Sequence, residues 1–122
     1  MKKVKRNVAI FVSHADGQPV FRDSEGNVSV PGKEPKFETL TKSKGKVFLF
    51  AAEGVDVITS ITVNDDPKGI IKSKVDEDGG KYWVVKIRKR EEGTAKYTVV
   101  YTDDNGGTHT VDPKIIIKAP GN

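Results

Sequence analysis

The richest group of polar side chains lies in residues 101–113, YTDDNGGTHTVDP, where acids, glycines and a histidine fall between apolar runs. Such a group could bind a metal ion, contribute to an active site, or form a turn between two strands. The EF-hand pattern D-x-[DN]-x-[DN]-G-x5-E needs Gly at position six, where the loop bends sharply. Counted from Asp103, Gly107 takes position five and Thr108 position six, so the pattern fails. The segment that begins at Asp76, DEDGGK, fails in the same way.

A turn accounts for this group more simply. Asn105-Gly106 is a dipeptide that tolerates positive φ at both central positions of a hairpin turn. We expect the carboxylates of Asp103 and Asp104 to accept hydrogen bonds from loop amides. His109 is then expected to face solvent or a neighbouring strand. The sequence therefore predicts a turn here.

Calcium binding stays open as an alternative use of the acidic loops. Loops 64–66, 76–78 and 103–105 could converge at one end of a sandwich. A calcium site would need three or four carboxylates about 2.3–2.6 Å from the ion. The sequence alone assigns no metal ligand and no cofactor-binding residue.

Catalytic motifs are scarce. The chain has no Cys, which removes disulfides, thiol catalysis and thiolate zinc sites, and its two histidines are His14 and His109. No G-x-S-x-G and no phosphate-binding loop occurs. His14 and Asp16 in SHADG invite an acid–base interpretation, but we expect an ordinary exposed loop. A carboxylate pair for glycoside chemistry among the 17 acids is a further alternative. We predict no catalytic residue and no enzyme.

The apolar residues follow the period of β-strands. No window shows the i, i+3, i+4, i+7 spacing of a helix, and turn signals recur every 8–12 residues or so. We predict one all-β domain over residues 1–122, an antiparallel sandwich of about seven to nine strands, with a frayed tail at 118–122. The expected strands are 7–12, 20–22, 27–30, 36–40, 46–52, 55–63, 70–75, 81–89, 96–102, 109–111 and 114–118.

Alternation also assigns the faces of these strands. In the run 55–63 it places Ile58 on one face and Val57, Ile61 and Val63 on the other. In the run 96–102 it places three side chains together on one face: Tyr97, Val99 and Tyr101.

The segment GTAKYTVVYTD resembles the penultimate strand of immunoglobulin-like sandwiches. The resemblance implies that Tyr97 is a corner tyrosine whose hydroxyl bonds back to the upstream turn. Val99 stands where antibody domains have Cys, and Trp83 lies on the strand before instead of on an early strand. The expected likeness is to the broad sandwich architecture.

The chain is mildly basic, with a formal net charge of +4. Lysines at strand edges discourage aggregation, so a solvated surface is the simpler interpretation and a polyanion site the alternative. In the run 81–90, KYWVVKIRKR, Trp83 alternates in phase with Val85, and only Tyr82 shares a face with Lys86. This favours a core Trp over a base-stacking platform, so nucleic acid is not the expected partner.

No secretory or membrane-spanning segment is expected. The N-terminal apolar run covers only Val8 to Val12, shorter than a signal peptide requires. No run reaches the roughly 18 apolar residues of a membrane span. We expect a cytoplasmic protein.

The Glu34-Pro35 of KEPKF and the Asp112-Pro113 of TVDPKIII resemble the marks of the DP-EP family, small single-domain bacterial proteins of unassigned function. That resemblance implies a β-sandwich and brings no activity with it. The leading hypothesis is a non-enzymatic β-sandwich that binds another macromolecule, such as a protein, as a binding or assembly module. Calcium-dependent binding and weak polyanion binding are the alternatives.

Overall fold

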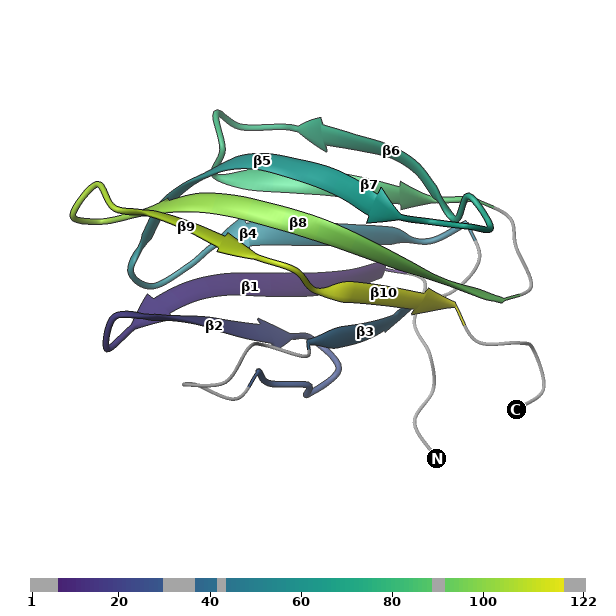
Figure 1. The fold of residues 1–122 in the computed structure, drawn as a ribbon, viewed down its shortest axis with the longest axis horizontal. Helices are drawn as coiled ribbons and strands as arrows, with labels where there is room; N and C mark the ends of the chain where they lie inside the picture. The colour runs from purple at the N-terminus through teal and green to yellow at the C-terminus, as the bar shows by residue number, and fades with distance from the viewer. Residues whose placement is uncertain (1–6, 30–36, 42–43, 89–91, 118–122) are drawn as a thin grey trace.

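The computed structural model describes residues 7–29, 37–41, 44–88 and 92–117 (Figure 1). These residues form ten strands and no helix, which confirms the all-β prediction and exceeds the expected strand number. The strands are β1 (Asn7–Ala15), β2 (Gln18–Asp23), β3 (Glu38–Thr41), β4 (Lys46–Ala51), β5 (Val55–Asp65), β6 (Ile71–Asp76), β7 (Tyr82–Ile87), β8 (Gly93–Asp103), β9 (Thr108–Val111) and β10 (Lys114–Ile117).

Within the described ranges, no helix is long and apolar enough to cross a membrane. The predicted tail at 118–122 and the Glu34-Pro35 dipeptide lie outside the described residues. The predicted strand 27–30 is not found over its described part, 27–29, where Val28 forms only an isolated bridge with Arg22.

The strands form two sheets. The first has the order β2-β1-β4-β7-β6, and the second has the order β3-β10-β8-β5, with β9 also paired to β8. Figure 1 shows β5 and β8 crossing in front of β4 and β7, as two packed sheets require. This two-sheet arrangement confirms the β-sandwich at the level of its layers.

The prediction of a purely antiparallel sandwich is wrong. β1 pairs with β4 in parallel, and β3 pairs with β10 in parallel. All other strand pairs are antiparallel. Each parallel pair joins strands that are not neighbours along the chain, because parallel strands need a long crossover between them. Local turn signals do not reveal such pairs.

The faces predicted for residues 55–63 are also wrong. The buried residues of β5 are Val55, Ile58 and Ile61, three positions apart, whereas Val57 and Val63 are only half-buried. The pairing of β5 with β8 shifts register three times along its length. Each bulge inserts an extra residue, which moves the following side chains to the opposite face. Strict alternation therefore fails for β5.

The core lies between the two sheets and includes the predicted face of β8, where Tyr97, Val99 and Tyr101 are all fully buried. The core cluster comprises Ile10, Val12, Phe21, Phe37, Val47, Leu49, Val55, Ile58, Ile61, Ile70, Val85, Ile87, Ala95, Tyr97, Val99, Tyr101, Val111 and Ile115. Trp83 packs against it and donates its indole N–H to the Ile58 carbonyl at 2.9 Å. The prediction of a Trp on the apolar face is confirmed.

The corner-tyrosine prediction for Tyr97 is not met by the structure. Its hydroxyl is buried and has no hydrogen-bond partner among the described residues. Burial, followed by the nearby charge of Asp23, raises the pKa of Tyr97. The ring therefore acts as a core side chain, and its polar atom does not fasten an upstream turn.

One device closes three of the tight turns. In each, the Oδ1 atom of an aspartate accepts hydrogen bonds from the amides two and four residues later. Asp23 binds Glu25 and Asn27, Asp76 binds Asp78 and Gly80, and Asp103 binds Asn105 and Gly107. The amide hydrogen bonds lie between 2.7 and 3.2 Å. These three aspartates thus have a structural role, as the turn interpretation predicted for Asp103.

Candidate functional site

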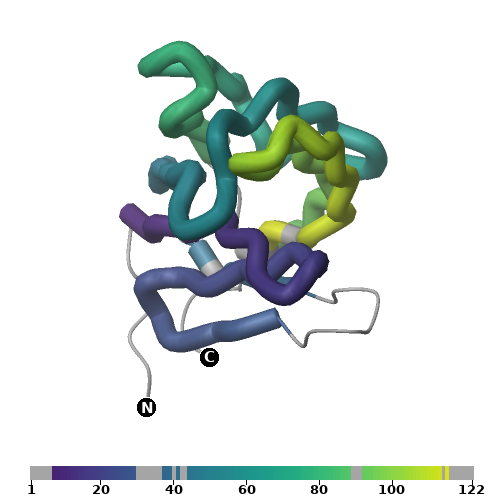
Figure 2. The backbone as a smooth tube through the Cα atoms, turned by 90° about the vertical axis from the view of Figure 1, so that its left-hand side faces the viewer, coloured from purple at the N-terminus to yellow at the C-terminus, as the bar shows by residue number. Residues whose placement is uncertain are grey.

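The loops β1–β2, β4–β5, β6–β7 and β8–β9 lie at the same end of the sandwich (Figures 1 and 2). The loop between β4 and β5 joins its neighbours there: the Glu53 carbonyl accepts from the His14 amide at 2.8 Å. The Gly54 carbonyl accepts from the Asp104 amide at 3.1 Å, and the Gly80 carbonyl accepts from the Ile58 amide at 2.8 Å. These contacts hold strand ends from both sheets together.

His14 lies on a strand, so the expectation of an exposed loop at His14 is wrong. Asp16 and Gly17 have positive φ values of 52° and 75°, which allows a two-residue hairpin turn and lets β1 continue to Ala15. The side chain of His14 is only 12% exposed. Asp16 is exposed, as expected. The polar groups beside the His14 imidazole belong to Tyr101 and Asp103.

His109 lies on β9 directly opposite Tyr101 of β8. The turn before it closes with an Asp103 amide that donates to the Gly107 carbonyl at 2.8 Å. Within this turn Gly106 alone has a positive φ, so the expectation of positive φ at both Asn105 and Gly106 is wrong. A two-residue hairpin loop needs two left-handed residues, whereas this longer loop between β8 and β9 needs only one, a glycine.

The two histidines meet across the two sheets, although they come from β1 and β9. Their ring centroids are 4.2 Å apart. Asp103 lies beside both rings, and its Oδ2 atom is 2.7 Å from His109 Nε2 and 3.7 Å from His14 Nε2. The Tyr101 hydroxyl lies 2.8 Å from His14 Nδ1. We call these four residues the histidine cluster.

The charge on Asp103 determines how protons are arranged in the histidine cluster. The hydrogen bond from His109, followed by the amide of Gly107, lowers the pKa of Asp103 to about 2. The carboxylate is therefore ionised at neutral pH and can only accept, so His109 donates through an Nε2–H group. Burial, followed by the charge of Asp103, raises the pKa of Tyr101. Its hydroxyl keeps its proton and can donate to His14 Nδ1.

Two glycines leave room for the histidine cluster. A Cβ at Gly54 would lie 2.1 Å from the His14 carbonyl oxygen, and the φ of Gly54 is +80°. A Cβ at Gly107 would lie 2.8 Å from Asp103 Oδ2 and 3.4 Å from His109 Nε2. The approach to the His14 backbone requires glycine at position 54, whereas a Cβ at position 107 would displace the Asp103 side chain.

The acidic loops do not converge as the calcium alternative requires. Two of these loops lie at opposite ends of β6, because residues 64–66 precede the start of this strand and residues 76–78 follow at its end. Among the described residues, the one group of three or more potential metal-ligating side chains is His14, Asp103 and His109. The cluster pairs two imidazoles with one carboxylate and differs from the oxygen-only donor set that calcium prefers.

A second feature is the outer face of the β2-β1-β4-β7-β6 sheet, which carries rows of cross-strand neighbours. One row is basic, with Lys46 of β4 directly opposite Lys86 of β7. The next row is apolar: Ala9, Phe48, Val84 and Val75. The third row is aromatic and ends in a cation: Tyr82, Phe50, Phe11 and Arg22. We call this surface the outer face. Phe11 and Val75 are 36% and 45% exposed.

The aromatic rings of the outer face stack on one another. Phe11 and Phe50 have centroids 5.8 Å apart, and Phe50 and Tyr82 are 5.5 Å apart, with interplanar angles of 21° and 29°. The faces of these rings are therefore largely used within the protein. Within residues 81–90, Tyr82 shares the outer face with Lys86, as predicted. Phe48 and Phe50 of KVFLFAA also face outward, because they alternate with the buried Val47 and Leu49.

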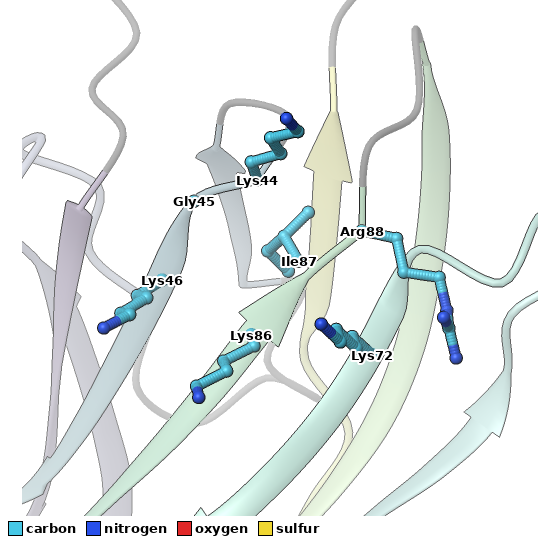
Figure 3. A pocket seen from close by; sticks show the side chains of 7 residues that line it. All are labelled: Lys44, Gly45, Lys46, Lys72, Lys86, Ile87 and Arg88. Carbon is cyan, nitrogen blue, oxygen red and sulfur yellow. The ribbon is translucent and has the colours of Figure 1, made fainter.

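An open cavity of about 500 Å³ lies at the basic end of the outer face (Figure 3). Its lining comprises Lys44, Gly45, Lys46, Lys72, Lys86, Ile87 and Arg88. All five cations are exposed, and none forms an ion pair with a described residue. Lys44 also has a positive φ of 59°, a backbone conformation that is costly for a residue with a Cβ.

The sequence signals for the histidine cluster are local and incomplete. Asp16-Gly17 indicates a hairpin that would place His14 on a strand. His109 is two residues before the buried Val111, so alternation places both side chains on the same face of the strand. Nothing local indicates that these strand ends meet. No protein-family model matches this chain, and no curated protein matches it.

Proposed function

We propose that this domain is a non-enzymatic binding module that captures an acidic segment of another protein on its outer face. The observation that carries this proposal is the basic row, in which Lys46 and Lys86 lie directly opposite each other on neighbouring strands. Like charges at such positions destabilise a sheet. An anionic partner would relieve that repulsion.

The neighbouring rows favour an acidic protein segment over a nucleic acid. Proteins that bind single strands offer free aromatic faces on which bases stack. The rings of Phe11, Phe50 and Tyr82 are stacked on one another, which covers both faces of the Phe50 ring in the middle of the stack. A ring edge carries partial positive charge and suits carboxylates and apolar side chains. A peptide that alternates acidic and apolar residues could contact the basic and apolar rows together.

The test uses a short fluorescein-labelled peptide that alternates glutamate with leucine, and fluorescence anisotropy measures its affinity. We expect binding that weakens as NaCl rises from about 50 to about 200 mM, because salt screens exposed charges. Lys86→Glu should weaken binding about tenfold, or about 1.4 kcal/mol. Lys96→Glu changes the net charge equally on the other sheet, and should leave the affinity unchanged.

Two results would contradict this proposal. Equal losses in Lys86→Glu and Lys96→Glu would show that net charge alone attracts the peptide. Tighter binding of a labelled oligothymidylate of matched charge would show that the outer face prefers nucleic acids to acidic peptides. The immunoglobulin-like architecture, the DP-EP relationship and the cytoplasmic location stay predictions of the sequence.

A further inference from the structure

We propose that the histidine cluster is a binding site for a divalent transition-metal ion, with His14 Nε2, His109 Nε2 and Asp103 Oδ2 as its ligands. Zinc is the ion we use as a probe. The site lies apart from the outer face and does not depend on the function proposed for it. It uses both histidines of the chain, which come from strands β1 and β9.

The spacing of the three donor atoms suits a metal ion. Asp103 Oδ2 lies 2.7 Å from His109 Nε2 and 3.7 Å from His14 Nε2, and ligand atoms from all three residues lie within 4.8 Å of one another. Two donors that are each about 2.1 Å from zinc lie about 2.9–3.4 Å apart, depending on the bond angle. The observed distances bracket this range, so small side-chain rotations would suffice.

The donor types select the class of ion. Imidazole nitrogens suit zinc, copper, nickel and iron, whereas calcium and magnesium prefer oxygen ligands alone. Two imidazoles and one carboxylate supply three ligands and leave the fourth position of a tetrahedral site for water or another ligand. The side chains of His14, Asp103 and His109 are 12%, 11% and 27% exposed, so an ion can reach them from solvent.

Groups around the ligands already hold them in position. Asp103 Oδ1 accepts from the amides of Asn105 and Gly107, which leaves Oδ2 directed at the imidazoles. His14 Nδ1 lies 2.8 Å from the Tyr101 hydroxyl. With zinc on Nε2, His14 carries its proton on Nδ1 and donates it to the Tyr101 oxygen. Hydrogen bonds of this kind fix the ring orientation of metal-bound histidines.

Isothermal titration with zinc chloride measures the site, after the protein has been treated with a chelator. We expect one zinc ion per chain, and a melting temperature about 10 °C higher when free zinc exceeds the dissociation constant about a hundredfold. Cobalt should give the intense visible absorption of a four-coordinate ion. His14→Ala and His109→Ala should each remove the stoichiometric binding.

Two conservative variants separate ligation from folding. Asp103→Asn can keep an oxygen for the two amides but loses the anionic ligand, and it should weaken zinc binding at least about tenfold. Asp76→Asn is its matched control, because Asp76 closes its turn in the same way and has no histidine beside it. Tyr101→Phe should weaken binding about tenfold, as expected for a positioning residue.

The proposal is overturned if the wild-type protein binds no zinc at about a hundred micromolar, a concentration at which weak structural sites still fill. It is also overturned if both histidine variants, shown by circular dichroism to be folded, bind zinc as the wild type does. Equal weakening in Asp103→Asn and Asp76→Asn would assign the effect to the turns instead of the ligand. Equal loss of peptide binding in Lys86→Glu and Lys96→Glu would contradict the function proposed for the outer face but would leave the zinc result untouched, so the two proposals fail separately.

Discussion

At the scale of single residues, one buried polar atom should lower the free energy of unfolding. The hydroxyl of Tyr97 is buried without a partner among the described residues. A buried polar group without a hydrogen bond costs about 1–3 kcal/mol. Its presence indicates that the ring is needed for packing and that the oxygen contributes nothing to stability.

We predict that Tyr97→Phe raises the free energy of unfolding by about 1–2 kcal/mol, because it removes only the unpaired oxygen. The raised pKa of Tyr97 gives a second expectation. Stability is unaffected by this group below its unfolded pKa of 10.0 and is lost as pH rises above that value, where the unfolded tyrosine ionises. Urea unfolding at about pH 9 and 11 should show a smaller loss in the variant. A variant less stable than wild type at both pH values would disprove this.

Gly54 is a second residue whose identity follows from geometry. Gly54→Ala should destabilise the protein by about 3 kcal/mol or more, since the overlap with the His14 carbonyl adds to the cost of a left-handed backbone. Gly69 is the matched control, because its φ is +61° and a Cβ there would meet nothing within 4 Å. Gly69→Ala should cost only about 1–2 kcal/mol. Thermal unfolding measures both, and equal losses would refute the steric argument.

At the scale of the strands, alternation predicted much and failed where the backbone is irregular. The faces of β7 and β8 follow from period two, so Trp83 and Tyr97 were correctly assigned to the core side. The same reasoning gave the wrong faces for β5, because the pairing of β5 with β8 shifts register three times. The sequence of β5 alone does not reveal these shifts. The histidine cluster could not be predicted for a similar reason. Only tertiary packing brings β1 and β9 together, and no local sequence pattern indicates that contact.

The basic row gives a prediction that concerns two neighbouring strands. Lys86→Glu should stabilise the folded domain by about 0.5–1 kcal/mol, because it turns a like-charge pair with Lys46 into an opposite-charge pair. Lys74→Glu lies opposite Val85 and should change stability by less than about 0.5 kcal/mol. Chemical denaturation at low salt compares them. Destabilisation by Lys86→Glu would mean that Lys46 and Lys86 do not repel each other.

At the scale of the whole molecule, the second sheet is closed by the last described strand. β10 lies between β3 and β8, with the fully buried Ile115 in the core. β3 pairs with no other strand in the sheet order. The sequence predicted a strand at this place but not its central position, because pairing with β3 joins segments far apart along the chain.

A chain that ends after Pro113 should therefore lose cooperative unfolding. Without β10, β3 has no partner and β8 presents an open edge, which favours association between chains. Thermal unfolding followed by circular dichroism, together with size-exclusion chromatography, tests this expectation. A truncated protein that stays monomeric and melts in one sharp transition would show that β10 is dispensable.

The repeated aspartate turn has a consequence for how chemistry can be added to this fold. One oxygen of Asp23, Asp76 or Asp103 secures the chain reversal, and the other is left for a separate task. At Asp23 the spare oxygen meets Asn27 and Thr39, and at Asp103 it meets the imidazoles. A corner of this design can acquire or lose a ligand-binding role through its neighbours while the reversal itself stays intact. Asp76 is thus a ready place to engineer a second cluster.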